Sequence, residues 1–124
     1  KMIRIAVGCA LLGLFGQPSA VLAQSLEPGK YTGTFSYLWM DKPMQDMATL
    51  TIETVDGNQF QGVAWLGNKL CRVDTPVRGR LDGETLTVTG KPVKDGCGVR
   101  WDLKVKGTKF EGKTSGGNTL TLSK

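Results

Sequence analysis

The chain contains no histidine, which removes the side chain that most often acts as a general base near neutral pH. The remaining catalytic candidates are Asp41 and Asp46, because two carboxylates can act as acid and base in glycoside hydrolysis. Both stand in the segment YLWMDKPMQDM, where Asp, Lys and Pro are typical of a solvated turn. We therefore predict that the protein is not an enzyme and that it uses no cofactor.

The same segment collects aromatic and sulfur-containing side chains suited to binding: Tyr37, Trp39, Met40, Met44 and Met47. Three interpretations are open. Trp39 and the methionines could fold back and plug one end of the domain, because Met fills irregular gaps and Trp supplies a large apolar area. They could instead form a lid or contact surface for a small apolar ligand or a protein, since Met side chains adapt to different partners. Finally, the thioethers of Met40, Met44 and Met47 could bind Cu(I) or Ag(I), because soft sulfur selects soft ions.

The beginning of the sequence indicates export. A short basic stretch precedes the apolar run IAVGCALLGLF, which is too short to span a bilayer and is followed by small residues up to Ala23. This order is typical of a secretory signal peptide, so we predict cleavage after Ala23. Residues 1–23 would then be the signal and residues 24–124 a single domain, in a bacterial periplasm or outside the cell. A lipoprotein signal ending at Cys9 is the alternative.

Two cysteines, Cys71 and Cys97, remain in the predicted mature domain. Thiols in an oxidising compartment are expected to pair, and we predict a disulfide between them. Closing this loop stabilises a domain by roughly 3–4 kcal/mol in the chain-entropy description. A zinc site is not favoured, because the predicted domain has no histidine and no third cysteine.

Alternation of apolar and polar residues with period two dominates the rest of the chain. It predicts strands at 30–38, 48–55, 60–66, 70–74, 77–81, 85–91, 99–105, 109–114 and 119–123, with 70–74 and 77–81 forming one strand or two, broken by Pro76. Short glycine-containing turns join them, so successive strands must be antiparallel. We predict an all-β meander of about eight strands closed into a small barrel, because closure removes the exposed edges. A two-sheet β-sandwich is the alternative.

The segments GKYTGTF, FQGVA and FEGKT give the chain a resemblance to the calycin group of small exported barrels, the avidins and lipocalins. The resemblance is one of architecture and covers most of the predicted mature domain. Tyr31 stands where lipocalins carry a tryptophan, and no residue that binds a ligand in these families is matched. The resemblance therefore implies a barrel and assigns no functional residue.

Trp65 falls on the opposite phase from Phe60, Ala64 and Leu66 in its predicted strand. Either a bulge near Gly62 resets the alternation, or Trp65 points outward as a contact residue. We favour the bulge or a packing role at the end of the barrel, because a glycine within a strand often marks a bulge. Trp65 stays among the candidate contact residues.

Basic residues alternate outward on the predicted strands 99–105 and 109–114 and shortly after the first of them: Arg100, Lys104, Lys106, Lys109 and Lys113. Cross-strand pairing should place them on one face, interspersed with Asp102 and Glu111. An anionic partner is one interpretation, but the interspersed acids favour an ordinary solvated exterior. Loss of Lys1 and Arg4 with the signal lowers the formal net charge from +5 to +3, and we expect no nucleic-acid partner.

The sequence predicts a monomeric, non-enzymatic binding protein without a membrane span. Its contact residues would be Tyr37, Trp39, Met40, Met44, Met47 and Trp65, near the mouth of the barrel. The first hypothesis for the partner is a small apolar ligand, because eight-stranded barrels can hold one. A protein-binding or inhibitor module, like the barrel-shaped lysozyme inhibitors, is the second. A surface or antigenic protein without a discrete ligand is the third.

Overall fold

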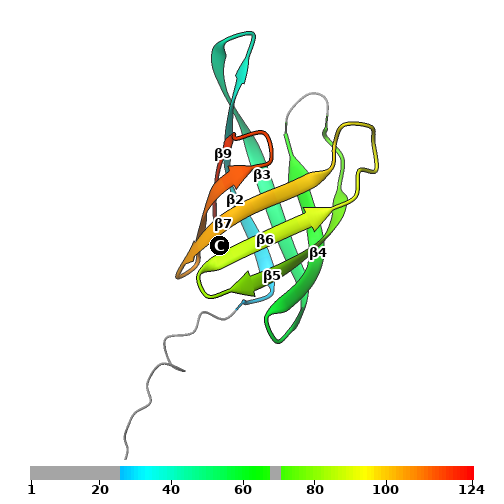
Figure 1. The fold of residues 1–124 in the computed structure, drawn as a ribbon, viewed down its shortest axis with the longest axis vertical. Coiled ribbons are helices and arrows are strands. Elements are labelled where there is room, and N and C mark those ends of the chain that lie inside the picture. Colours follow the sequence, from blue (N-terminus) through cyan, green and yellow to red (C-terminus); the bar gives the residue numbers. More distant parts are fainter. Residues whose placement is uncertain (1–25, 68–70) are drawn as a thin grey trace, which may run out of the picture.

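The computed structural model describes residues 26–67 and 71–124, which form one closed antiparallel β-barrel (Figure 1). Its eight strands are β2 (Gly29–Trp39), β3 (Lys42–Asp56), β4 (Gln59–Leu66), β5 (Thr75–Asp82), β6 (Thr85–Gly90), β7 (Val99–Lys106), β8 (Lys109–Thr114) and β9 (Thr119–Ser123). Each strand pairs with the next along the chain, and β9 pairs with β2 to close the barrel. The predicted meander and its closure are confirmed, and the two-sheet sandwich is wrong.

Glycines at positive φ make several of the short turns. Gly57 (φ 65°) and Gly83 (φ 64°) occupy the β3–β4 and β5–β6 turns, in a conformation that side chains with a Cβ adopt only with strain. Strands β8 and β9 begin and end at the predicted residues. The turn chemistry and the alternation together set the register of these hairpins.

The barrel interior is filled by side chains. Strands β5 and β7 alternate strictly between buried and exposed residues, as the sequence predicts. The largest fully buried side chains are Trp101, Phe110, Leu50, Ile52, Leu86, Leu103, Leu120, Leu122, Val88 and Val105. These residues belong to one continuous core that runs through the barrel. A small barrel of eight strands is just wide enough for side chains to fill, which is what this core does.

A bulge interrupts β3 where it pairs with β4. The register shifts between Ile52, which pairs with Gly62, and Thr54, which pairs with Gln61. Glu53 is therefore the extra residue. From Gln59 to Trp65, strand β4 itself alternates between buried and less buried residues. The predicted bulge near Gly62 is therefore on the partner strand, and it does not turn Trp65 toward the core.

Pro76 lies inside β5 and pairs with Val63, so the prediction that it breaks the strand is wrong. Strand β6 pairs with β5 only from Arg78 onward. Pro76 has no backbone N–H, but at this position it removes no hydrogen bond between β5 and β6. Residues 71–74, predicted as strand, form no strand. Leu70, which begins that prediction, is outside the described residues.

One end of the barrel, which we call the closed end, is sealed by contacts between the beginning and the end of the described chain. The Tyr31 hydroxyl donates a hydrogen bond of 3.0 Å to the Glu27 carbonyl, and its ring stacks on Phe110 with centroids 4.4 Å apart. The Lys124 ammonium lies 3.2 Å from the Glu27 carboxylate. Leu26 is buried beside them in the core.

The predicted signal peptide, its cleavage after Ala23 and the alternative at Cys9 lie outside the described residues. Within residues 26–67 and 71–124, no helix is long and apolar enough to cross a membrane.

Candidate functional site: a projecting arm

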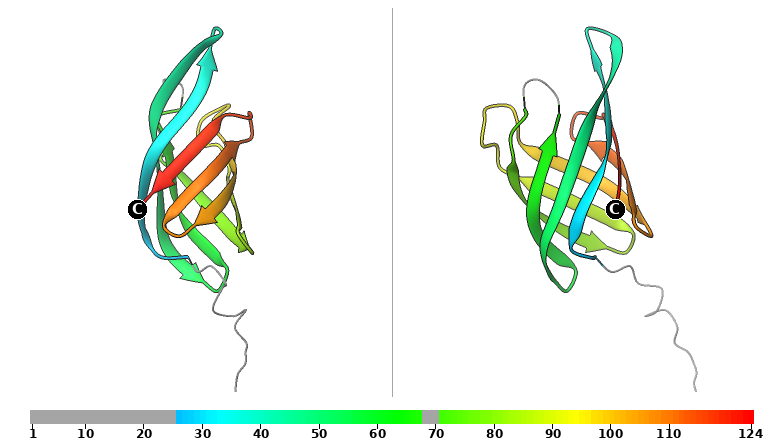
Figure 2. Two further views of the ribbon diagram at one scale, coloured as in Figure 1. Left: turned by 90° about the vertical axis from the view of Figure 1, so that its left-hand side faces the viewer. Right: turned by 180° about the vertical axis from the view of Figure 1, so that it is seen from behind.

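Strands β2 and β3 continue beyond the barrel as a two-stranded hairpin, which we call the arm (residues 37–47; Figures 1 and 2). Strand β9 pairs with β2 only as far as Ser36. On the other side, the register of β4 with β3 begins at Ala48, with one further bond from the Gly67 amide to the Met47 carbonyl. The arm is thus held by the pairing of its own two strands, and neither of its outer edges pairs with another strand of the described residues.

The predicted strands 30–38 and 48–55 leave a gap between Leu38 and Ala48, and this gap is wrong. Strand β2 runs to Trp39, β3 begins at Lys42, and the two are joined by Met40 and Asp41. Both turn residues have positive φ, 52° and 65°, as a two-residue type I′ turn requires. Asp tolerates this left-handed conformation, whereas for Met it costs about 1–2 kcal/mol.

The register assigns the arm's side chains to two faces. Tyr37 pairs with Met44 and Trp39 pairs with Lys42, so these four share the face that continues from the barrel interior. Leu38, Pro43 and Met47 lie on the opposite face, which continues from the barrel exterior. Of the predicted contact residues, the structure brings Tyr37, Trp39 and Met44 together on one face.

The arm exposes apolar side chains to an extent that the rest of the described chain does not match. The exposed fractions are 66% for Leu38, 54% for Trp39, 81% for Met40, 38% for Met44 and 57% for Met47. Only Val93, at 53%, is a comparably exposed large apolar residue among those described. The interpretation that Trp39 and the methionines plug the barrel is therefore wrong.

The arm separates the three thioethers that were considered as copper ligands. Met44 lies on one face, Met47 on the other, and Met40 occupies the turn. These positions do not bring the three sulfur atoms together around one ion. Among residues 26–67 and 71–124, no group of three or more His, Cys, Asp and Glu residues could hold a metal ion.

Tyr37 and Asp46 form the one polar contact on the inner face of the arm's base. The Tyr37 hydroxyl donates a hydrogen bond of 2.5 Å to Asp46 Oδ2, and the Tyr37 ring stacks on Phe35 at 5.0 Å. This hydrogen bond, with partial desolvation and the negative charge of Asp46, raises the pKa of Tyr37 above its usual value. Asp41 lies at the far tip, at least ~13 Å away along β3, so the two carboxylates do not converge as a catalytic pair.

Trp65 lies on β4 near the base of the arm, outside the core and half-buried. The end of its indole ring lies close to Gly67, where a Cβ would be only 3.3 Å from Trp65 Cη2. Arg72 donates a hydrogen bond of 2.9 Å from Nε to the Gly67 carbonyl. The Trp65 ring therefore lies against Gly67 at the arm end of the barrel, and its role as a contact residue stays a prediction.

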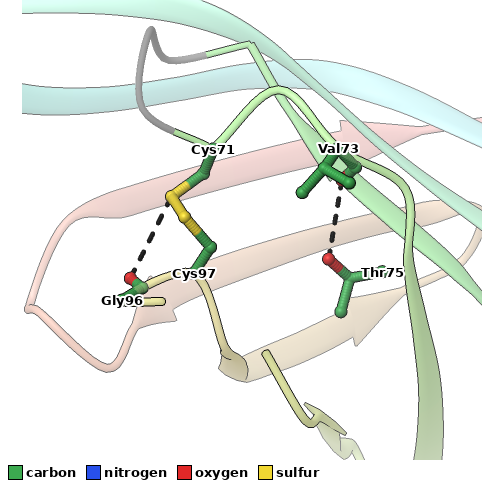
Figure 3. The surroundings of a disulfide bond; sticks show 5 residues. All are labelled: Cys71, Val73, Thr75, Gly96 and Cys97. Atoms are coloured by element: carbon green, nitrogen blue, oxygen red, sulfur yellow. Dashed lines mark hydrogen bonds between the residues drawn. A yellow bond between two sulfur atoms is a disulfide. The ribbon is translucent and has the colours of Figure 1, made fainter. Parts of the chain in front are cut away.

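The predicted disulfide is confirmed and ties together two loops at the arm end of the barrel (Figure 3). Cys71 belongs to the β4–β5 connection and Cys97 to the β6–β7 connection, with a Cα–Cα distance of 5.5 Å. The Gly96 carbonyl oxygen lies 4.0 Å from Cys71 Sγ. The bond therefore holds two chain segments side by side that no strand pairing joins.

A cavity of about 160 Å³ lies among these disulfide-linked loops and the β8–β9 turn. Its lining includes the buried residues Ala64, Thr75 and Trp101, and the hydroxyl and amide side chains of Ser115 and Asn118. Sequence reasoning missed this cavity. Its residues come from four separate segments, and no local pattern links them.

The basic residues of β7 and β8 lie on one outer face, as predicted. Asp102 pairs with Lys113 and Lys104 pairs with Glu111 across the strands. Glu111 also lies 2.9 Å from the Lys109 ammonium, and this hydrogen bond lowers the pKa of the Glu111 carboxyl. Exposed pairs of this kind contribute little to stability, because water and salt screen their charges, which fits a solvated exterior.

No protein-family model, curated protein or solved structure matches this chain. The closed eight-stranded barrel is compatible with a calycin-like architecture.

Proposed function

We propose that this protein is an exported binding module that contacts a partner protein through the arm. The observation that carries the proposal is the exposure of Leu38, Trp39 and Met40 at the end of a hairpin projecting from a fully packed barrel. Exposed apolar side chains that gather in one place mark interaction sites, whereas scattered ones need no explanation. Aromatic residues and Met are enriched at protein interfaces.

The conformation of the turn supports the proposal independently. Met40 has φ 52°, where Asn or Gly would be less strained, and its side chain is 81% exposed. A strained, exposed apolar residue at the tip lowers stability and contributes no packing. Such local strain occurs preferentially at functional positions.

A protein fits the arm better than the other partners considered. The packed core fills the barrel, so an apolar ligand inside it would have to displace buried side chains. Asp41 stands at the tip itself, and placing a carboxylate in hydrocarbon is expensive, which disfavours insertion into a lipid bilayer. A narrow ribbon with an apolar tip and a terminal charge suits a concave cleft on another protein. The disulfide supports export, because such bonds persist in oxidising compartments.

Site-specific photo-crosslinking tests the proposal. A photoreactive phenylalanine derivative replaces Met44 in the full-length protein within the cells that produce it, and the same derivative at Thr108, at the closed end, is the matched control. We expect one protein to be captured from position 44 and not from position 108. Capture should disappear when Trp39→Ala is added, since truncating an interface hot spot weakens binding by about 2 kcal/mol or more.

Binding of the captured protein is then measured with purified components. Trp39→Ala should lower the affinity, whereas Lys109→Ala, at the closed end, should leave it unchanged. Equal capture from both positions, or an affinity that Trp39→Ala does not change, contradicts the proposal. Binding of the arm to anionic or neutral lipid vesicles in place of a protein also contradicts it.

A further inference from the structure

An open groove of about 1030 Å³ lies on the outer wall of the barrel. The pairing of β6 with β5 ends at Thr89, opposite Arg78, and the chain then enters the β6–β7 connection. The groove lies between this connection and the outer faces of β3, β4 and β5. Its lining includes four exposed or half-buried apolar residues: Val63, Pro76, Pro92 and Val93. A partner in solution can therefore contact these side chains directly.

The groove and the arm together hold the strongly exposed large apolar side chains of the described chain. Among residues 26–67 and 71–124, Val93 is the only such side chain outside the arm. Docking of an arm in a groove covers both regions at once, and burial of apolar surface is the main driving force of most protein association. The groove exceeds the usual range of small-molecule pockets, about 300–1,000 Å³, so it suits the several side chains of a protein segment.

The charges at the tip of the arm complement those of the groove. Arg78 and Lys91 are exposed cations in the groove, and Asp41 carries the opposite charge at the tip. Glu53, also exposed in the groove, is opposite in sign to Lys42, the next residue of the arm. None of these charged side chains forms a salt bridge within the described residues. Complementary charges of this kind set the orientation of docking and disfavour wrong partners.

The arm cannot fill the groove of its own chain. Residues Lys42 to Asp56 form the single strand β3, so the tip lies roughly 35 Å along the strand from Glu53. Figure 1 shows the tip of the arm well apart from the β6–β7 connection. An arm that occupies the groove therefore belongs to a second molecule.

We propose that the partner of the arm is a second copy of this chain, with the arm of each copy docked in the groove of the other. This inference rests on the proposed function of the arm and names its partner. Each copy contributes one arm and one groove, so a reciprocal dimer uses both contacts and has the two-fold symmetry that is commonest among homo-oligomers. The dimer replaces the monomer that the sequence predicts.

Sedimentation velocity of the purified protein over a range of concentrations measures the association. We expect a reversible dimer, and a monomer at every concentration overturns the proposal. Asp41→Lys should weaken the dimer at least about tenfold, because like charges then face each other at both contacts. Asp82→Lys, the same change at an exposed position at the closed end, is the matched control and should leave the dimer unchanged. Circular dichroism checks that each variant is folded.

An exchange of charges decides whether the arm meets the groove. The double variant Arg78→Glu and Lys91→Glu should also fail to dimerise, because two carboxylates then face Asp41. An equal mixture of this variant with Asp41→Lys should form a dimer of one copy of each, since both contacts again join opposite charges. A groove variant that dimerises like the parent, or a mixture that stays monomeric, overturns the proposal.

The result is separable from the test of the arm itself. Capture of this same chain by the photoreactive group at position 44 supports both proposals. Capture of a different protein, with the purified chain monomeric, overturns the second copy and leaves the arm as a binding site. A dimer that neither Trp39→Ala nor Asp41→Lys weakens is formed through another surface, and it overturns this inference alone.

Discussion

The two ends of the barrel differ in the burial of their aromatic residues. At the closed end, Tyr31 and Phe110 stack on each other at 3% and 2% exposure. At the arm end, the same strand β2 continues beyond Ser36, the last residue that pairs with β9, and presents Trp39 at 54% exposure. The alternation that buries Tyr31 and Phe35 also places Tyr37 and Trp39 on the same face. Tyr37 still packs against the edge of the core, whereas Trp39 lies beyond it.

Whether an apolar residue is buried in this molecule depends on which strands lie beside it and not on the type of its side chain. Phe35 still has β9 beside it, because it pairs with Leu120. Trp39 has only β3 beside it. Residues at the closed end are therefore expected to stabilise the fold, whereas the exposed residues of the arm contribute little packing.

The largest effect that tests this division is expected from Phe110→Ala at the closed end. It removes a buried ring from the core and its stacking partner from Tyr31. We expect the free energy of unfolding to fall by about 3–5 kcal/mol. Urea denaturation followed by circular dichroism measures it, with the exposed neighbour Lys109→Ala as the control. A loss no larger than that of Trp39→Ala would contradict the comparison.

The next largest effect is expected from removing the disulfide at the arm end. The double variant Cys71→Ala and Cys97→Ala should lower the free energy of unfolding by roughly 3–4 kcal/mol, because the unfolded chain gains freedom. Reduction of the parent protein should give a similar loss. The arm lies outside the loops that this bond joins. Partner binding per folded molecule should therefore persist, and its loss would show that the two regions depend on each other.

The same contrast explains what the sequence predicted. The sequence predicts the first and last residues of strands β8 and β9 correctly. These strands bury one face, so their sequences alternate, and glycine-containing turns mark their ends. For the arm the sequence predicts no strand, because Asp41, Lys42 and Pro43 resemble a breaking turn. Its inner face also mixes Trp39 and Met44 with Lys42 and Asp46, which erases the alternation. A hairpin that buries neither face carries no hydrophobic periodicity to detect.

The cavity could not be predicted for a different reason. Thr75, Trp101 and Asn118 meet only because the barrel closes and the disulfide joins two loops. The sequence predicts that the barrel closes, but it does not predict the register between the strands. This register determines which loop side chains face one another. The sequence indicated the disulfide and not what its loops would enclose.

A smaller effect of opposite sign is expected at the arm's tip. Met40→Asn places a residue that tolerates positive φ at the first position of the turn. The free energy of unfolding should rise by about 1 kcal/mol. Met47→Asn, in the extended strand β3 of the same arm, is the control and should give no gain. If Met40→Asn does not stabilise the protein, strain at the tip is not evidence for a contact role.

The pKa values of the two tyrosines report on the two ends of the barrel separately, because one tyrosine lies at each end. The Asp46 hydrogen bond raises the pKa of Tyr37, and burial raises that of Tyr31. Each phenol is therefore favoured in its neutral form by folding. This stabilisation is present below the unfolded value of about 10 and is lost as the pH rises through the folded pKa.

Ultraviolet absorbance of the tyrosinate form follows both groups. Asp46→Asn should lower the pKa of Tyr37 toward its usual value, because the charged acceptor is gone, and should leave Tyr31 unchanged. A change in both groups would indicate that the variant disturbs the barrel as a whole. Both groups titrating at the usual value in the parent protein would contradict the hydrogen-bond geometry.

The smallest effect on stability is expected from Trp39→Ala. Trp39 lies beyond the core, and its cross-strand neighbour Lys42 is itself exposed, so little packing is lost. The free energy of unfolding should change by no more than about 0.5 kcal/mol, the usual range for a surface position. Trp101→Ala, the matched removal of a tryptophan that is 1% exposed, should instead be strongly destabilising. A large loss from Trp39→Ala would mean that the arm packs against the barrel in solution, and its apolar tip would then belong to the core rather than to an interface.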